Sequence, residues 1–551
     1  MNKNNSLAGK GIEQTIFWPA VVAVLCTSVP LMLFPEAGSQ IVNNLFAWIT
    51  GTFSWLFLLT GVASFAFMGW LAFGPLGRIK LGAPEDAPEF STGAWITMLF
   101  CAGIGISICA WSFAEPIYLL DGPPLHLAKG TTAATEWAAM YPMFHWGLIP
   151  WAIYLLPAVP MAYYLYVRKG NVLRLSEACR GVFGGLIDGP LGKLIDVIVM
   201  FSIIGAVGTS LGLSVPLVSA LFQEMFGLEQ SFLLQLGVLA LWTLMIAWSV
   251  WNGLSKGIQT LSNFNGVLAL LMLVFVLAAG PTLYLMGLWT NSMGLYLDNF
   301  FHISTWTDPV EKGGFPEGWT VFYWAWWVAY APMMGLFVAR ISRGRTIKDL
   351  VLNGVIWGSV GCWAFFAIWG GYAVHLQTTG VVDLLSILNN QGMPAMVVAV
   401  MKTLPFSGLI IPAFTVLCFV FLATTVDSSA YTLASISTRE LNGYEEPARA
   451  NRILWAVLLA LFGVGLLVVG GLKAVQTSTL VVALPMLPVM LIMAISLVRW
   501  AREDFGSALD SKVCSLRLSN GRHEVVDQLD AAPAAQAAPA TVMAKAQPAS
   551  N

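Results

Sequence analysis

The stretch from Gly318 to Trp327 reads GWTVFYWAWW, so four of its ten residues are tryptophan. Trp324, Trp327 and Tyr330 recur every third residue and share one face of a helix. A second cluster, FHWGLIPWAIY, runs from Phe144 to Tyr154. Each ring face attracts a cation by about 0.5 to 2 kcal/mol, depending on how far water is excluded. Three or four such rings would bind a trimethylammonium group, which donates no hydrogen bond, without a buried carboxylate.

Membrane proteins usually place tryptophan in the belt at the membrane interface, and this placement accounts for most of the 23 tryptophans here. Trp18, Trp48, Trp455 and Trp500 are expected to belong to such a belt. Trp151, Trp326 and Trp327 fit it less well, because they belong to clusters rich in other aromatic residues.

The composition is that of a polytopic membrane protein. Of 551 residues, 57% are hydrophobic and 10% charged, against about 25% charged in soluble domains. The net charge of -2 gives no basic patch for nucleic acid. The seven cysteines form no CxxC pair and the five histidines no HExxH motif, so neither a metal site nor a disulfide framework is indicated.

Apolar runs of spanning length predict twelve transmembrane helices. The first run, Thr15 to Phe34, lacks a small-residue cleavage site and is expected to be a retained helix. Lys and Arg concentrate in alternate loops if the N-terminus is inside, so both termini are predicted to be cytoplasmic. The helices are expected to begin near residues 15, 52, 93, 137, 191, 230, 264, 319, 353, 407, 451 and 476.

The third predicted helix contains FCAGIGIS, Phe100 to Ser107, with Gly103 and Gly105 in mid-span. Glycine in a helix costs about 1 kcal/mol relative to alanine. The glycines indicate either close helix packing or a discontinuous helix whose freed backbone binds substrate or ion.

The tenth predicted helix contains FLATTVDSSAY, in which Thr424 and Thr425 offer adjacent hydroxyl oxygens suited to sodium. On spacing alone, the two hydroxyls are expected to bond back to their own helix. Asp427 either bonds locally, to backbone or Ser429, or helps to gate the cytoplasmic side.

Other polar residues have simple structural explanations. Glu115, before Pro116, is expected to be an interfacial acid near the outer end of its helix. His145 is expected to be a hydrogen-bonded structural residue. The positive-inside rule is the first explanation for three arginines, and a role in an inner gate is the second. They are Arg340, Arg343 and Arg345.

GWTVFYWAWW followed by ARISRGRTIKD, Ala339 to Asp349, resembles the signature of the betaine–choline–carnitine transporter family. CAGIGIS and FHWGLIPWAIY resemble its third and fourth helices, and SKGIQTLSNFN, Ser255 to Asn265, its seventh. The resemblance covers about Ile12 to Trp500. It implies an all-α polytopic membrane protein with a LeuT-like core of two inverted five-helix repeats, and a homotrimer.

The resemblance gives the two repeats, and the charge pattern and composition give the rest of the expected division. It comprises a cytoplasmic N-terminal segment (1–14), two peripheral helices (15–90), the first repeat (91–288), an amphipathic connecting helix (289–318), the second repeat (319–500) and a disordered cytoplasmic tail (501–551).

The resemblance also implies the site residues. The central box comprises Trp146, Trp151, Tyr154 and Trp327, and the route inward is lined by Trp324, Trp326, Tyr330 and Phe337. The sodium ligands would be the hydroxyls of Thr424 and Thr425 and the backbone oxygens of Cys101, Ile104 and Phe421.

Three departures from the family pattern bear on coupling. Ile203 and Val207 replace the threonines of a second sodium site, and Met333 replaces its phenylalanine. Sodium-independent members fill the first site with an arginine, where this chain has Gly266. The resemblance therefore implies one sodium site.

Family membership implies a secondary transporter, not an enzyme, that imports glycine betaine, carnitine, choline or dimethylsulfoniopropionate through the bacterial inner membrane by alternating access. Sodium is the coupling ion and no cofactor is expected. Ser107 stands where proton-coupled choline carriers tend to have aspartate, which favours zwitterions. Alternatives are a sodium-independent exchanger, a proton-coupled choline symporter, an onium-binding sensor or channel, and a membrane enzyme.

Overall fold

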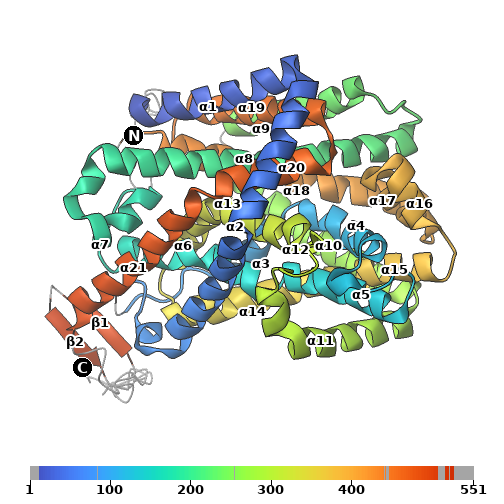
Figure 1. The fold of residues 1–551 in the computed structure, drawn as a ribbon. Helices are drawn as coiled ribbons and strands as arrows, with labels where there is room; N and C mark the ends of the chain where they lie inside the picture. The colour runs from blue at the N-terminus through green and yellow to red at the C-terminus, as the bar shows by residue number, and fades with distance from the viewer. Residues whose placement is uncertain are drawn as a thin grey trace, which may run out of the picture.

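The computed structural model describes residues 11–83, 85–252, 255–439, 441, 446–506, 515–519 and 522–526. Almost all of these residues are helical (Figure 1). In this part of the chain nine helices are long and apolar enough to cross a membrane, or up to twelve if each of three bent pairs is one span. The prediction of an all-α polytopic membrane protein is thereby confirmed. Residues 1–10 and most of the predicted tail lie outside the described ranges.

If each bent pair is counted as one span, the described residues hold twelve candidate spans, which follow from the apolar runs because a backbone inside lipid must satisfy its own hydrogen bonds. In chain order they are α1 (Gln14–Leu33), α2 (Pro35–Phe73), the bent pair α3 (Thr92–Ile104) and α4 (Ser107–Asp121), α5 (Thr132–His145) with α6 (Leu148–Tyr166), α8 (Pro190–Phe226), α9 (Phe232–Asn252), the bent pair α10 (Ser255–Ala279) and α11 (Thr282–Thr305), α13 (Thr320–Ile341), α14 (Ile347–Phe365) with α15 (Gly371–Thr378), α18 (Ser407–Ile436), α19 (Arg449–Val469), and the bent pair α20 (Gly471–Ala483) and α21 (Met486–Phe505).

Short elements connect these spans. They are α7 (Arg180–Phe183), α12 (Phe315–Gly318), α16 (Leu384–Gln391), α17 (Met393–Thr403), the 3-10 turns η2 (Pro75–Arg78), η3 (Pro124–His126), η4 (Leu175–Cys179) and η5 (Gly184–Asp188), and the π-helical turn η6 (Phe366–Gly370) between α14 and α15.

The structure corrects three sequence expectations. Helix α2 begins at Pro35 rather than near residue 52, because Pro35 and Glu36 form a favourable first turn. The connecting helix α11 begins at Thr282 rather than at residue 289, and it is bent by 110° from α10. In the tail, strands β1 (Ser515–Ser519) and β2 (Arg522–Val526) form an antiparallel hairpin where disorder was expected.

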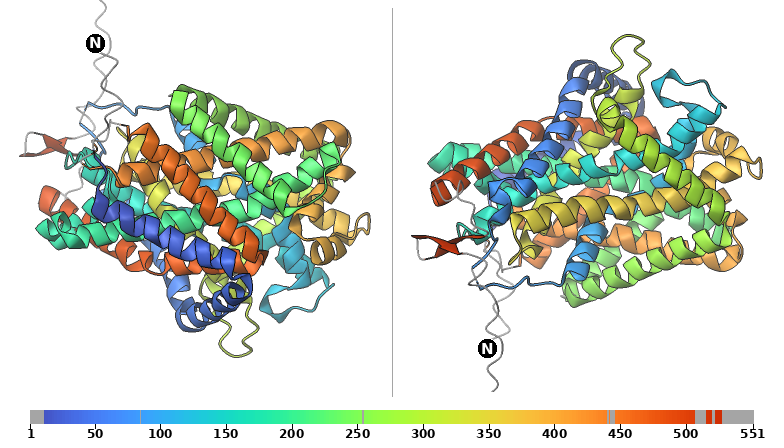
Figure 2. Two further views of the ribbon diagram at one scale, coloured as in Figure 1. Left: turned by 90° about the horizontal axis from the view of Figure 1, so that it is seen from above. Right: turned by 90° about the horizontal axis from the view of Figure 1, so that it is seen from below.

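The buried centre is built on α13, which packs along α6 and also contacts α8 and α20. Helix α18 packs against α8, and the broken pair α3–α4 contacts α5, α14 and η6. The view from above shows α1 beside α19 at the periphery (Figure 2, left). This arrangement brings the aromatic helices and the glycine-rich break into one interior region.

Candidate functional site

A cavity lies where the break between α3 and α4 faces α6, α8, α13 and α18. Its walls are formed by Ala102, Gly103, Ile104, Gly105, Ile106, Ser107, Trp146, Tyr154, Ser210, Trp326, Trp327, Tyr330 and Thr425. The wall therefore combines residues at the break of one helix pair with aromatic residues of α6, of α13 and of the junction between α5 and α6.

The break is a property of Gly105. Helix α3 ends at Ile104, α4 begins at Ser107, and the two helices are bent by 64°. Gly105 has φ of 54° and ψ of -156°, a conformation that is essentially restricted to glycine. A Cβ atom at this position would lie 2.8 Å from the Thr425 hydroxyl oxygen. The structure thus supports the discontinuous-helix alternative for the glycine stretch.

The predicted aromatic box is assembled at this break. Ring centroids of Tyr154 and Trp327 are 4.4 Å apart, and those of Trp146 and Trp327 are 5.6 Å apart. The Tyr154 hydroxyl donates to the Gly103 carbonyl at 3.0 Å, and Trp327 Nε1–H donates to the His145 carbonyl at 3.1 Å. These bonds fix two of the rings against the broken helix and the end of α5.

Trp151 belongs to the cluster but not to the cavity wall. Its ring lies 5.9 Å from Trp327 and 5.8 Å from Tyr154. On its other side it packs against α14, where a Cβ at Gly358 would approach the indole to 2.2 Å. Trp151 therefore supports the box from behind.

The four residues predicted to line the inward route divide into two groups. Trp326 and Tyr330 line the cavity, and the Tyr330 hydroxyl is 2.6 Å from Ser210 Oγ. Trp324 lies against α2 instead, 2.6 Å from where a Gly61 Cβ would stand. Phe337 is half-buried and is not among the residues that form the cavity. Ser210 was not singled out in the sequence, because a lone serine in an apolar run carries little signal.

The cavity is too small for substrate in this conformation. Its volume is about 20 Å³. That room suffices for about one water. An onium group can therefore enter only if the rings separate.

Glu115 is not the interfacial acid that its sequence position favoured. Its side chain is fully buried and lies 2.6 Å from His145 Nδ1. Trp146 Nε1–H donates to its second oxygen at 3.0 Å. The Tyr323 hydroxyl donates to that same oxygen at 2.5 Å. The prediction that His145 is a hydrogen-bonded structural residue agrees with these contacts.

The candidate sodium ligands lie on α3, just before the break, and on α18. Thr424 Oγ1 and Thr425 Oγ1 both donate to the Phe421 carbonyl, at 2.9 and 3.0 Å. The hydroxyls thus bond back to their own helix, as spacing alone predicted, while their oxygen lone pairs stay available to a cation. Among the predicted ligands, Thr425 and Ile104 line the cavity. In the described residues no group of three or more His, Cys, Asp or Glu residues is suited to a metal ion.

The family model described as BCCT, betaine/carnitine/choline family transporter, matches residues 15–506. The chain belongs to this family. A BCCT protein is a membrane transporter, so the chain is a transporter and not an enzyme. It is also similar to a solved Na⁺-coupled sialic acid symporter in a substrate-bound outward-open state, with 12% identity, a TM-score of 0.41, and coverage of 81% of this chain and 86% of that chain. A similarity this weak adds nothing to the assignment.

The structure shows the surroundings of the residues at which this BCCT chain departs from the family's sodium-site pattern. Ile203 and Val207 are fully buried and apolar. Met333 accepts a hydrogen bond from Ser429 Oγ at 3.0 Å. A Cβ at Gly266 would lie 3.5 Å from Cys101 Sγ, so a longer side chain there would start beside a predicted sodium ligand.

In the described part of the chain the Asp427 carboxylate pairs with neither Ser429 nor the backbone, so the alternative of a local bond is wrong. Its carboxylate lies 3.2 Å from the guanidinium of Arg452 on α19, and the Arg452 guanidinium lies over the ring of Tyr431. Arg340 on α13 donates to the hydroxyl of the same Tyr431 at 2.8 Å. In this BCCT chain, these four side chains therefore link α13, α18 and α19 at one end of the helices.

Other arginines tie the same end together. Arg343 contacts Asp86 at 3.1 Å, and this guanidinium holds the pKa of the Asp86 carboxyl below its usual value. Arg345 pairs with Asp349 at 2.6 Å.

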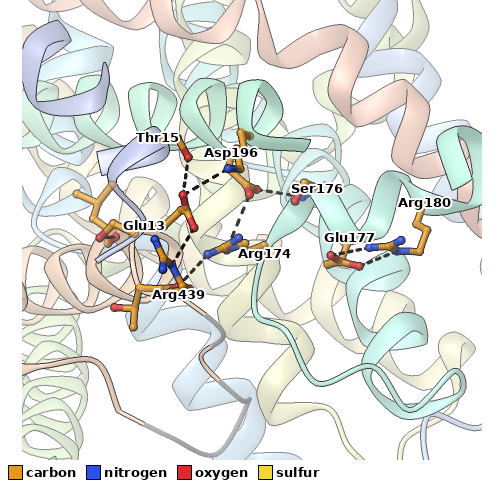
Figure 3. A network of polar contacts seen from close by, with 12 residues as sticks. Glu13, Thr15, Arg174, Ser176, Glu177, Arg180, Asp196 and Arg439 are labelled. Carbon is orange, nitrogen blue, oxygen red and sulfur yellow. Dashed lines mark hydrogen bonds and ion pairs between the residues drawn. The ribbon is translucent and has the colours of Figure 1, made fainter. Parts of the chain in front are cut away.

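A further polar network joins the start of α1 to α8 and to the end of α18 (Figure 3). Glu13 contacts Arg439 and Lys193, each at 3.4 Å. The hydrogen bond from Thr15 and these two cations lower the pKa of Glu13. Arg174 lies 3.9 Å from Asp196 and donates to the Thr438 carbonyl at 2.9 Å. The network therefore holds together the segment before α1, the segment before η4, the start of α8 and the segment after α18.

Proposed function

We propose that the protein is a secondary active transporter that imports quaternary ammonium or related onium compounds by alternating access. The observation that carries this proposal is the contact between Tyr154, Trp327 and Trp146 at the helix break. No acidic side chain is among the described residues that form the cavity. Ring faces, rather than a carboxylate in the wall, would hold the onium group.

The proposed substrates are glycine betaine, carnitine, choline and dimethylsulfoniopropionate. Ser107 lines the cavity and places a hydroxyl, not a charge, beside the substrate. We favour zwitterions for this reason. Gain of choline uptake in Ser107→Asp would support this preference, and its absence would count against it.

We further propose one sodium site, formed by the hydroxyls of Thr424 and Thr425 and the backbone oxygens of Cys101, Ile104 and Phe421. Apolar Ile203 and Val207 supply no oxygen ligands for a second site, and Gly266 brings no arginine to the first. One charge driven across about 150 mV gains about 3.5 kcal/mol, and a tenfold sodium gradient adds about 1.4 kcal/mol. Together they would sustain roughly thousandfold accumulation of a zwitterion.

The proposed setting is the bacterial inner membrane, with both termini in the cytoplasm and a homotrimeric assembly. Two inverted five-helix repeats, 91–288 and 319–500, would supply the moving parts. The basic residues at the ends of α13, α18 and α19 agree with a cytoplasmic location for that end.

Radiolabelled uptake into proteoliposomes tests the proposal. The four onium compounds are compared with and without sodium, and counterflow separates a carrier from a channel or sensor. We expect counterflow and a hyperbolic dependence of uptake on sodium. A Hill coefficient near two, or uptake independent of sodium, would refute the single sodium site. The absence of uptake for all four compounds would refute the substrate class.

A further inference from the structure

Behind the cavity wall, Glu115 forms the centre of a buried polar cluster with His145, Trp146, Tyr323 and Thr320. All five residues are at most 3% exposed. The cluster joins α4, α5 and α13, the helices that carry or support the aromatic box. A buried carboxylate without partners costs several kcal/mol. The hydrogen-bond partners of Glu115 therefore bear on whether its side chain is ionised.

The hydrogen bonds define a consistent set of donors. Trp146 Nε1–H can only donate, and it donates to Glu115 Oε2 at 3.0 Å. The Tyr323 hydroxyl donates to the same oxygen. His145 Nδ1 faces Glu115 Oε1 at 2.6 Å, and His145 Nε2 faces Thr320 Oγ1 at 3.0 Å. With the proton on Nδ1, His145 donates to Glu115 and accepts from Thr320.

In this tautomer every partner of Glu115 is a neutral donor. Three donors satisfy a carboxylate, and the cluster as a whole then carries one negative charge. Among the ion pairs of the described residues, Glu115 is paired with His145 alone. A neutral histidine leaves that charge uncompensated in a low-dielectric interior, where its field extends further than in water.

The charge is coupled to the box through two indoles. Trp146 lines the cavity and donates its N–H to the carboxylate, which enriches the indole ring in electron density. Trp327 also lines the cavity and donates its N–H to the His145 carbonyl at 3.1 Å. The carboxylate is therefore one side chain removed from the place where an onium group would lie.

We propose that Glu115 is a specificity-determining positioning residue, a buried counter-charge that acts through Trp146 to favour a positively charged headgroup over an uncharged one of the same shape. This inference rests on the proposed function. It assigns the charge selectivity of the box to a residue that does not touch the substrate.

The test compares ligands that differ only in replacing the onium nitrogen by carbon. Glycine betaine is paired with 3,3-dimethylbutanoate, and choline with 3,3-dimethylbutan-1-ol. Binding to the purified full-length protein is measured by tryptophan fluorescence or calorimetry. In Glu115→Gln we expect the onium member of each pair to lose about tenfold in affinity and the member with the uncharged tert-butyl headgroup to change by less than about twofold.

Two further variants separate charge from packing. Glu115→Asp keeps the charge, so the preference for the onium headgroup over the tert-butyl headgroup should persist even if both affinities fall. Trp146→Phe keeps a ring but removes the N–H link, so the preference should fall toward that of Glu115→Gln. As a matched control, Asp121→Asn changes an exposed acid at the end of the same helix, which pairs with Lys129 at 2.8 Å, and should leave the preference unchanged.

Equal losses for both members of a pair in Glu115→Gln would overturn the inference and reduce Glu115 to a structural support. An unchanged preference in that variant, or a lost preference in Glu115→Asp, would overturn it too. These outcomes differ from failure of the proposed function, in which the unmodified protein binds neither betaine nor choline and both proposals fall together.

Discussion

Helix α13 and the α3–α4 pair line the same cavity with different groups. Helix α13 is continuous over Thr320–Ile341 and presents the rings of Trp326 and Trp327. The α3–α4 pair is bent by 64° at Gly105 and presents backbone from residues 102–107. A large, weakly hydrated cation is recognised by ring faces, whereas a small, hard cation needs oxygen ligands. In the proposed function, each wall therefore holds a different cation.

The two walls also differ in how they tolerate change. A ring on a continuous helix can be removed without disturbing the backbone. A glycine whose conformation and clearance are both required cannot be replaced without moving Thr425. We therefore expect changes at the break to impair every step of transport, and changes on α13 to impair substrate affinity first.

The largest effect is expected for Gly105→Ala. Alanine would adopt a disfavoured backbone conformation, which costs about 1 to 3 kcal/mol, and its Cβ would lie 2.8 Å from Thr425 Oγ1. Uptake at equal protein in the membrane should fall at least about tenfold. Gly93→Ala is the matched control on the same helix, because its Cβ would meet nothing within 4 Å. Equal uptake by the two variants would contradict the role of the break.

Removal of a ring should come next. Trp327→Ala deletes a ring worth up to about 2 kcal/mol, so the apparent KM for betaine should rise up to about thirtyfold. Trp151→Ala should raise KM less, since Trp151 does not line the cavity. The control is Trp357→Ala, which removes a tryptophan that is 48% exposed on α14 and should leave KM unchanged. Unchanged KM values in both Trp327→Ala and Trp151→Ala, with normal insertion, would disprove the aromatic box.

Much of this comparison could be predicted from the sequence, because it depends on local patterns. Apolar runs gave the spans, ring spacing gave the clusters, and Gly103 and Gly105 marked the break. These signals lie within one or two helical turns of each other. The family resemblance named the aromatic residues of the site, of which Trp151, Trp324 and Phe337 do not line the cavity.

The remaining features depend on partners that are distant in sequence. Glu115 is buried by His145 and Tyr323, and Asp427 is paired with Arg452 on a different helix. Neither pairing has a local signature. The hairpin of β1 and β2 was missed because the alanine- and proline-rich segment that follows it dominates the composition of the tail.

A smaller and more selective effect is expected for Thr425→Val. The change removes a proposed sodium ligand but leaves the rings in place, so half-saturating sodium should rise several-fold while betaine affinity at saturating sodium changes little. Thr415→Val is the control, because Thr415 makes the same kind of bond to its own helix, to the Ile411 carbonyl at 2.8 Å. An identical sodium dependence in both variants would place the sodium site elsewhere.

The smallest effect is expected outside the spans, at His126. The hydrogen bond to Asp308 and the charges of Asp308 and Glu311 raise the pKa of His126 above its ordinary value of 6.5. The contact therefore stabilises the fold fully below that value and is lost as pH rises through the raised pKa. Hydrogen exchange of the loop 306–314, corrected for intrinsic rates, should slow at low pH. His126→Gln should abolish this pH dependence, and its persistence there would contradict the assignment.

The most direct test of the aromatic box leaves its shape intact. Trp327 is replaced by tryptophans carrying one, two and three fluorine atoms, which weaken the ring's attraction for a cation while retaining the N–H bond to His145. The logarithm of betaine affinity should fall linearly with each added fluorine. An affinity that does not change along the series would contradict the claim that the ring faces hold the onium group.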